Sequence, residues 1–238
     1  MSAGETPAPG RESELAEALA STRARIAAAV TAAGRDPAGV RLVVVTKNFP
    51  RSDLDALVRL GVRDVGENKE QELTAKMGEA PLPEDVRVHF IGQLQSRKSG
   101  AVARVADVVH SVDRVKLVGA LARGAEAAGR RLTVLLQVSL DGDPQRGGAL
   151  PADVPALADA VASAGLTLGG VMAVAPLGEE PRAAFARLRE VSERLRVDHP
   201  GAVEISAGMS GDLEAAIHEG ATLLRVGTAI LGSRPSHR

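Results

Sequence analysis

The sequence predicts an α/β fold, a single (β/α)8 TIM-type barrel preceded by an N-terminal helix. Three observations favour this prediction. From residue 40 onward, short β-branched runs alternate with Ala/Leu/Arg-rich segments of helical period. Eight such repeats occupy about 200 residues, the size of one closed barrel. Several runs, such as residues 42–45 and 133–136, are apolar on successive residues, as in parallel strands that are buried on both faces.

The predicted elements follow one another in a regular order. An amphipathic helix over residues 12–34 precedes the first strand, and a helical pattern follows each strand except the last, which ends in a short helix-like segment. The predicted strands cover residues 40–46, 62–65, 86–91, 107–111, 132–138, 168–174, 202–206 and 222–226. The competing architecture is an open doubly wound sheet. That fold usually carries a Gly-rich fingerprint after its first strand, where this chain has Thr46-Lys47-Asn48.

Composition narrows the class of protein. The chain has 238 residues with 30 acidic and 29 basic side chains, and this net charge of −1 argues against a nucleic-acid or polybasic membrane surface. It has no Cys, which excludes disulfides, thiolate nucleophiles and Cys-ligated metals. No apolar run reaches 18 residues. We therefore expect a cytoplasmic monomer in which residues 1–10 form a disordered tail, not a signal peptide, and residues 11–238 form the barrel.

Lys47 follows the first predicted strand directly. Barrel enzymes place their reactive groups at the carboxyl ends of the strands. A lysine at a buried strand end would lose solvation, which lowers the pKa of its ammonium and frees the amine to form a Schiff base with an aldehyde cofactor. The alternative is that the strand ends one residue earlier and that Lys47 points into water.

The segments after the last two strands have the composition of an anion site. Residues 206–210 read Ser-Ala-Gly-Met-Ser, and Gly227-Thr228 follows the last strand. Barrels commonly bind phosphate at this place through backbone N–H groups and a helix N-terminus. We expect Ser210 to cap a helix over residues 211–219, and Gly208 and Gly227 to leave room for an anion. Ordinary helix capping is the alternative explanation.

Arg225 lies between apolar neighbours in the last predicted strand. A buried guanidinium needs a partner, and only a closed barrel would place it beside Lys47 around one ligand. The alternative is a structural ion pair with an acid such as Glu67. The single histidines at strand ends, His89 and His110, are interpreted as structural. Residues 141–146 are expected to form a solvated loop, within a long connection that could cover a site at the barrel mouth.

Together these residues resemble the YggS/PROSC family of pyridoxal phosphate homeostasis proteins, which is similar to the barrel domain of alanine racemase. The resemblance covers nearly all of residues 40–232. It depends on motifs in this order: Val45-Thr46-Lys47, Gly66-Glu67-Asn68, His89-Phe90-Ile91-Gly92, His110-Ser111-Val112-Asp113, Ser206-Ala207-Gly208-Met209-Ser210 and Arg225-Val226-Gly227-Thr228.

The resemblance implies a role for each matching residue. Lys47 looks like the lysine that forms the internal aldimine with pyridoxal 5'-phosphate (PLP), and Arg225 like the partner of its pyridine nitrogen. Asn68 is similar to a residue beside the ring. The phosphate cradle implied by the family consists of Ser206, the backbone near Met209, Ser210, Gly227 and Thr228.

The chemistry of these residues favours a carrier over an enzyme. A guanidinium keeps its proton, so Arg225 would leave the pyridine nitrogen unprotonated and weaken the cofactor as an electron sink. Racemase chemistry of the alanine racemase type needs a second base, ordinarily a Tyr, and the chain has none. We therefore expect a protein that binds PLP and delivers it, with apo-enzymes as partners. The alternatives are a PLP-dependent racemase or decarboxylase, and an aldolase of phosphorylated sugars that uses Lys47.

Overall fold

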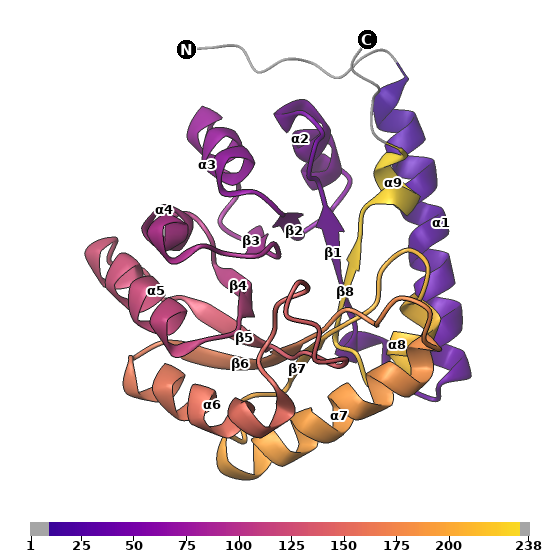
Figure 1. Cartoon of the computed structure of the whole chain (residues 1–238). Helices are drawn as coiled ribbons and strands as arrows, with labels where there is room; N and C mark the ends of the chain where they lie inside the picture. The colour runs from indigo at the N-terminus through magenta and orange to yellow at the C-terminus, as the bar shows by residue number, and fades with distance from the viewer. Residues whose placement is uncertain (1–9, 234–238) are drawn as a thin grey trace.

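Eight parallel strands close into a barrel (Figure 1). The structure, a computed structural model, describes residues 10–233. Each strand pairs with the next along the chain and β8 pairs with β1, so the predicted closed barrel is confirmed and the open sheet is wrong. The strands are β1 (Arg41–Val45), β2 (Asp64–Glu67), β3 (Arg87–Phe90), β4 (Val108–Val112), β5 (Thr133–Gln137), β6 (Thr167–Met172), β7 (Glu204–Ser206) and β8 (Leu223–Val226).

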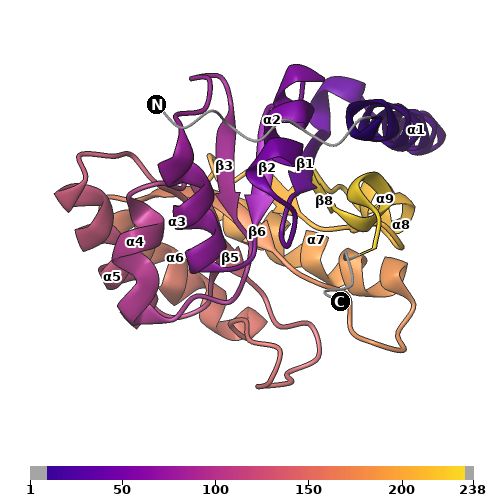
Figure 2. The ribbon, with the colours of Figure 1, turned by 90° about the horizontal axis from the view of Figure 1, so that it is seen from above.

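Helices surround the strands (Figures 1 and 2). They are α1 (Arg11–Ala32), α2 (Arg51–Arg59), α3 (Glu70–Glu79), α4 (Ser99–Ala103), α5 (Val115–Ala127), α6 (Val154–Ser163), α7 (Pro181–Asp198), α8 (Leu213–His218) and α9 (Thr228–Leu231). Three short 3-10 helices lie at Pro37–Gly39, Ser96–Lys98 and Pro151–Asp153. The predicted N-terminal helix is confirmed as α1, which packs against α2, α8 and α9. None of the helices within residues 10–233 is long and apolar enough to cross a membrane.

Two differences from the predicted boundaries have clear causes. The second strand begins at Asp64, two residues later than expected, because the N–H of Val62 still bonds to the carbonyl of Leu57 and closes α2. The predicted tail over residues 1–10 lies outside the described residues except for Gly10. Gly10 caps α1 with φ +86°, a left-handed conformation that glycine adopts without strain.

The inside of the barrel is only partly apolar. Alternate side chains on each strand point inward, and a small apolar cluster forms from Val43, Val108, Leu135, Met172 and Leu223. Several other buried inward positions are polar: His89, His110 and Ser206 are fully buried, and Arg225 is 4% exposed. The larger apolar core lies between the sheet and the helices. Burying a polar group without a hydrogen-bond partner costs free energy, so these side chains need partners. Their hydrogen bonds lead to the site described below.

Candidate functional site

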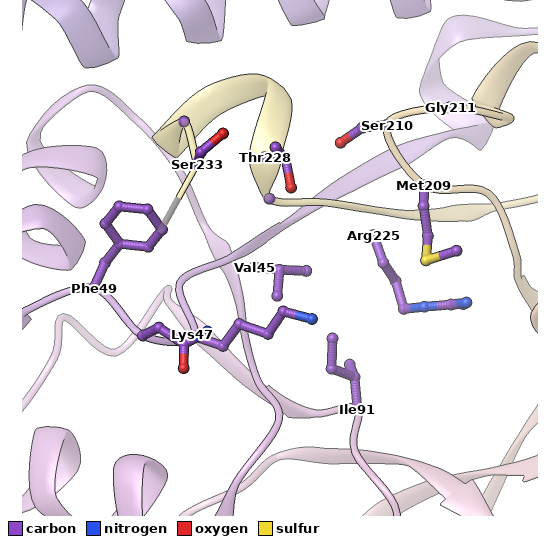
Figure 3. A pocket seen from close by; sticks show the side chains of 13 residues that line it. Val45, Lys47, Phe49, Ile91, Met209, Ser210, Gly211, Arg225, Thr228 and Ser233 are labelled. Carbon is purple, nitrogen blue, oxygen red and sulfur yellow. The ribbon is translucent and has the colours of Figure 1, made fainter. Parts of the chain in front are cut away.

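A cavity of about 410 Å3 at the carboxyl end of the barrel contains most of the residues that the sequence singled out (Figure 3). Lys47 and Arg225 both line this cavity, and no Asp or Glu is among the described residues around it. Two cations in a lining without a carboxylate favour an anionic ligand. The lining residues are Val45, Lys47, Asn48, Phe49, Ile91, Met209, Ser210, Gly211, Arg225, Gly227, Thr228, Gly232 and Ser233.

The pairing of the first and last strands brings the two cations together. Val43 of β1 lies opposite Arg225 of β8, and Val44 lies opposite Val226. The chain segments that follow these strands therefore enter the same cavity. Figure 3 shows the side chains of Lys47 and Arg225 reaching into it from neighbouring strands. This juxtaposition, predicted from barrel closure, is confirmed.

Lys47 differs from the prediction in one respect. The first strand ends at Val45, the next residue Thr46 is fully buried, and Lys47 is exposed. The argument that burial desolvates its ammonium is therefore wrong. The chain turns immediately afterwards, because Asn48 adopts φ +64°. The earlier strand end and the exposure of Lys47 agree with the alternative expectation, but Lys47 also lines the cavity.

Three charged side chains hold the turn that carries Lys47. Glu67 Oε1 accepts hydrogen bonds from Thr46 Oγ1 (2.5 Å) and from Lys76 Nζ (2.6 Å). Lys76 also donates to the carbonyl of Thr46 (2.8 Å), and Glu72 accepts from the backbone N–H of Asn48 (2.8 Å). Burial raises the pKa of Glu67 although the Lys76 ammonium opposes this shift. Sequence spacing does not reveal this support, because Glu67, Lys76 and Glu72 come from different elements.

Arg225 is buried without the carboxylate partner that the sequence suggested. Its guanidinium donates to Ser206 Oγ (2.6 Å) and to the carbonyl of Ala173 (2.9 Å). The proposed alternative, an ion pair with Glu67, is wrong because Glu67 faces the opposite side of the sheet and binds Lys76 of α3. Burial lowers the pKa of Arg225 to about 10, so the guanidinium keeps its positive charge at neutral pH.

Two residues assigned to the cofactor by resemblance do not line the cavity. Ser206 is fully buried inside the barrel, where its hydroxyl bonds to Arg225 and to His110 Nδ1 (2.9 Å). It is an inward residue of β7, one layer below the mouth. Asn68 packs against Gly92 so closely that a Cβ on Gly92 would lie 2.7 Å from its Oδ1. The structure thus separates both residues from Lys47.

The loop after β7 and the start of α9 face each other across the cavity. Ser210 does not cap a helix over residues 211–219 as predicted, because α8 begins at Leu213 with Asp212 at its N-cap position. Instead, Ser210 Oγ accepts a hydrogen bond from the N–H of Ala229 (3.3 Å), beside Thr228. The backbone N–H of Met209 donates to Asp212 Oδ1 (2.6 Å), so only its side chain is left to face a ligand.

The two glycines of this region are explained by packing. A Cβ on Gly208, which has φ +87°, would lie 2.6 Å from the Cβ of Ala216 in α8. A Cβ on Gly227 would lie 3.0 Å from the carbonyl oxygen of Val45. The expectation that these glycines make room for an anion is therefore wrong for Gly208, which does not line the cavity. Gly227 does line it, but its missing Cβ lets β8 approach β1.

Helix α1 supports the same loop from outside the barrel. Arg25 donates to the carbonyl of Ser210 (2.7 Å) and to Glu214 (2.6 Å). Residues 141–146 of the long connection after β5 are largely exposed, as expected for a solvated loop. Arg146 forms an ion pair with Asp141 and donates to the carbonyl of Ala175 (2.8 Å), so the connection is held in place. It lines a separate cavity and does not cover Lys47.

Comparison with known proteins identifies the family. Residues 18–235 match the family described as "Alanine racemase, N-terminal domain". A Mycobacterium tuberculosis protein named "Pyridoxal phosphate homeostasis protein" is 45% identical, covering 98% of each chain. A Pseudomonas aeruginosa protein of the same name is also 45% identical, over 93% of this chain and 96% of the relative. This chain belongs to the family of pyridoxal phosphate homeostasis proteins.

A solved structure of the family supports the relationship. PipY of Synechococcus elongatus, described with PLP bound, is 36% identical and has a TM-score of 0.80, covering 92% of this chain and 100% of PipY. The predicted family is thus confirmed, and the alanine racemase-like barrel agrees with the observed closed sheet.

Proposed function

We propose that this protein binds PLP in the Lys47 cavity, holds it as a Schiff base, and takes part in its homeostasis and delivery in the cytoplasm without efficient turnover of amino acids. The observation that carries this proposal is the cavity at the seam between β1 and β8. A primary amine and a buried guanidinium line it from neighbouring strands, and the described lining has no carboxylate.

The residues of the cavity fit the three functional groups of PLP. The amine of Lys47 would hold the aldehyde through one C=N bond, with the release of one water. The hydroxyls of Ser210 and Thr228 are donors suited to the phosphate, and Gly227 belongs to the same face. Arg225 is a donor without an acceptor atom, which suits an unprotonated pyridine nitrogen. When bound, the cofactor supplies an electron sink, and a hydrogen bond from Arg225 to its ring nitrogen would weaken that sink.

The same pairing argues against turnover. Arg225 keeps its proton at neutral pH, so it cannot pass one to the ring nitrogen. The chain has no Tyr to act as a second base. The relatives are named for the homeostasis of pyridoxal phosphate and not for a reaction. These points favour a carrier over the alternative, a racemase or decarboxylase of small amino acids.

Absorption spectroscopy tests the binding residue. We expect protein incubated with PLP to gain an absorption band in the visible or near-ultraviolet range, and borohydride followed by mass spectrometry to place the adduct on Lys47. Lys47→Ala should lose the band while keeping its thermal unfolding midpoint, because this exposed side chain packs little. Lys116→Ala is the matched control, since Lys116 is an exposed lysine of α5 that does not line the cavity. A band unchanged in Lys47→Ala would contradict the assignment.

Proton exchange tests the absence of turnover. Incubation of the PLP-loaded protein with individual amino acids in deuterated water should leave their α-protons in place, apart from the rate that free PLP gives. Rapid exchange of any amino acid would favour the racemase or decarboxylase instead.

Transfer to an apo-enzyme tests delivery. We expect the loaded protein to reactivate an apo-PLP enzyme faster than the cofactor dissociates into solution, because direct contact bypasses free PLP. Dissociation is measured separately with a trap for free PLP. Equal rates of reactivation and dissociation would contradict delivery by contact and leave the protein as a store of the cofactor.

A further inference from the structure

The positive charge of Arg225 is unusual for its position. The guanidinium is 4% exposed and, among the described residues, no carboxylate lies within ion-pair distance of it. Asp212 raises the pKa of Arg225 through space, but burial dominates and lowers it. An isolated buried charge is strongly destabilising unless something compensates it. The hydrogen bonds of Arg225 show where that compensation comes from.

A continuous chain of buried hydrogen bonds runs from Arg225 through the inside of the barrel. Arg225 Nη1 lies 2.6 Å from Ser206 Oγ, which lies 2.9 Å from His110 Nδ1. His110 Nε2 lies 2.8 Å from His89 Nδ1, and His89 Nε2 lies 2.8 Å from Asp64 Oδ1. The chain thus crosses from β8 to β7, β4, β3 and β2. It ends at the amino end of the barrel, where Asp64 begins its strand.

The donors and acceptors at the two ends fix the protons in between. The guanidinium can only donate and the ionised carboxylate can only accept. With both imidazoles neutral, His89 therefore carries its proton on Nε2 and accepts on Nδ1. His110 then donates from Nε2 and accepts on Nδ1, so the hydroxyl of Ser206 donates to His110 while accepting from Arg225. Every hydrogen bond points from Arg225 toward Asp64.

We propose that Asp64 is the terminal acceptor of a one-directional hydrogen-bond chain through Ser206, His110 and His89, and that this chain orients the guanidinium of Arg225. Hydrogen bonds that all point the same way polarise one another, and a low-dielectric interior strengthens the effect. The four residues beyond Arg225 are positioning residues: they hold the guanidinium in its orientation toward the cavity. What Arg225 faces there, the ring nitrogen of PLP, rests on the function proposed above.

Burial and charge agree with this arrangement of protons. Burial lowers the pKa of both histidines, that of His110 well below its usual range. Burial alone would raise the pKa of Asp64, but the hydrogen bond from His89 and the charges of Arg41 and Arg87 lower it, so the carboxylate stays ionised. The competing state is a charged His89 in an ion pair with Asp64. In that state His110 would carry its proton on Nδ1, and the two hydrogen bonds between His89, His110 and Ser206 would reverse, while Arg225 would still donate to Ser206 and His89 to Asp64.

Nitrogen-15 NMR of histidine-labelled protein distinguishes the two states without any cofactor. We expect His89 and His110, assigned with single His→Gln variants, to be neutral, each with its proton on Nε2, and unchanged between pH 6 and pH 8. A doubly protonated His89, or a His110 protonated on Nδ1, would overturn the proposal. Failure of the wild type to bind PLP would contradict the proposed function but leave this result intact.

A matched pair of substitutions tests the link to the cavity. Asp64 and Glu204 both bind Arg41 at the amino end of the barrel, but only Asp64 contacts a histidine. Asp64→Asn keeps an acceptor for His89 and removes the charge. We expect Asp64→Asn to raise the dissociation constant of PLP roughly tenfold and to shift the absorption maximum of the bound cofactor. Glu204→Gln should change the dissociation constant by about twofold or less.

Equal effects of the two substitutions, or no effect of Asp64→Asn, would overturn the coupling. If Asp64→Asn does not fold, as judged by circular dichroism, Ser206→Ala cuts the chain at its other end with the loss of one oxygen. It should also weaken PLP binding roughly tenfold. Both histidines should keep their protons on Nε2, because Asp64 still fixes them from the other end of the chain. Unchanged PLP binding in this variant would contradict the proposal.

Discussion

At the scale of single residues, Arg225 determines what the cavity can do. It supplies a donor where an acid would supply a proton acceptor, and its pKa of about 10 leaves it charged under physiological conditions. Lys47 supplies the amine, and its exposure gives a bound aldehyde access from solution. A fixed cation deep in the cavity and an accessible amine near its mouth suit a protein that must both retain and release its ligand.

Replacing the cation by an acid should change the electronic state of bound PLP. Arg225→Glu places a carboxylate at the ring nitrogen, which favours protonation of that nitrogen. We expect a shifted absorption maximum and weaker binding, by roughly tenfold or more, because the buried carboxylate has lost the guanidinium's partners. Absorption titration with PLP measures both quantities, with Arg225→Lys as the variant that keeps the charge. An unchanged spectrum would place Arg225 away from the ring.

The two buried histidines should make the protein sensitive to acid. Their pKa values are lowered by burial, so the unfolded chain binds protons near pH 6.5 that the folded chain does not. This stability is fully present above about pH 6.5 and is lost as the pH falls below it, by up to about 1.4 kcal/mol per pH unit for each histidine. Urea unfolding between pH 5 and pH 6.5 should therefore show a shallower slope for His110→Asn than for wild type. Equal slopes would mean that His110 is protonated in the folded state.

At the scale of elements, turns and a helix outside the barrel hold the site. The turn after β1 is fixed by Glu67, Lys76 and Glu72, which come from β2 and α3. The loop after β7 is fixed by Arg25 of α1. Helix α1 is thus part of the binding site's support, although its residues lie far from the cavity in sequence.

Removing the contact from α1 should weaken phosphate binding. Arg25→Ala frees the carbonyl of Ser210 and releases Glu214. We expect the dissociation constant of PLP to rise roughly threefold to tenfold, in line with the loss of one or two hydrogen bonds. Arg23→Ala, on the same helix, removes bonds to the carbonyls of Leu60 and Gly61 at the other end of the barrel and should leave PLP binding unchanged. Similar losses in both variants would show that α1 acts only through overall stability.

The elements also show how far the sequence could predict the site. Hydrophobic runs in the sequence show roughly where each strand ends. Because the carboxyl ends of parallel strands meet at one edge of the sheet, the sequence correctly predicts that Lys47, Arg225 and Thr228 lie at one cavity. The direction of a side chain within a strand of three residues is harder to predict, so the sequence does not reveal that Ser206 is buried inside the barrel. Pairings between strands are not encoded by spacing, and His89 and His110 therefore appeared to be unconnected.

At the scale of the whole molecule, closure of the barrel creates the site. The cavity lies where the chain's first and last strands meet, so neither half of the chain contains it alone. The chain from Asp64 to Arg225 likewise exists only in the closed barrel, because it connects five different strands. Binding and folding are therefore coupled, and a ligand held across the seam stabilises the closed state by mass action.

The oligomeric state is a prediction at this scale. The described surface carries its exposed large apolar side chains, such as Leu177 and Val197, on separate elements without a continuous stripe. We expect multi-angle light scattering at micromolar concentration to give one mass near 24.5 kDa, with and without PLP. A mass near twice this value would contradict the expected monomer.

A crystal structure of the protein loaded with PLP tests the central claim most directly. The account predicts electron density for one PLP joined to Lys47 Nζ, with the guanidinium of Arg225 within hydrogen-bond distance of the ring nitrogen and Ser210 and Thr228 at the phosphate. Density on a different lysine, or an Arg225 that faces away from the ring, would contradict it.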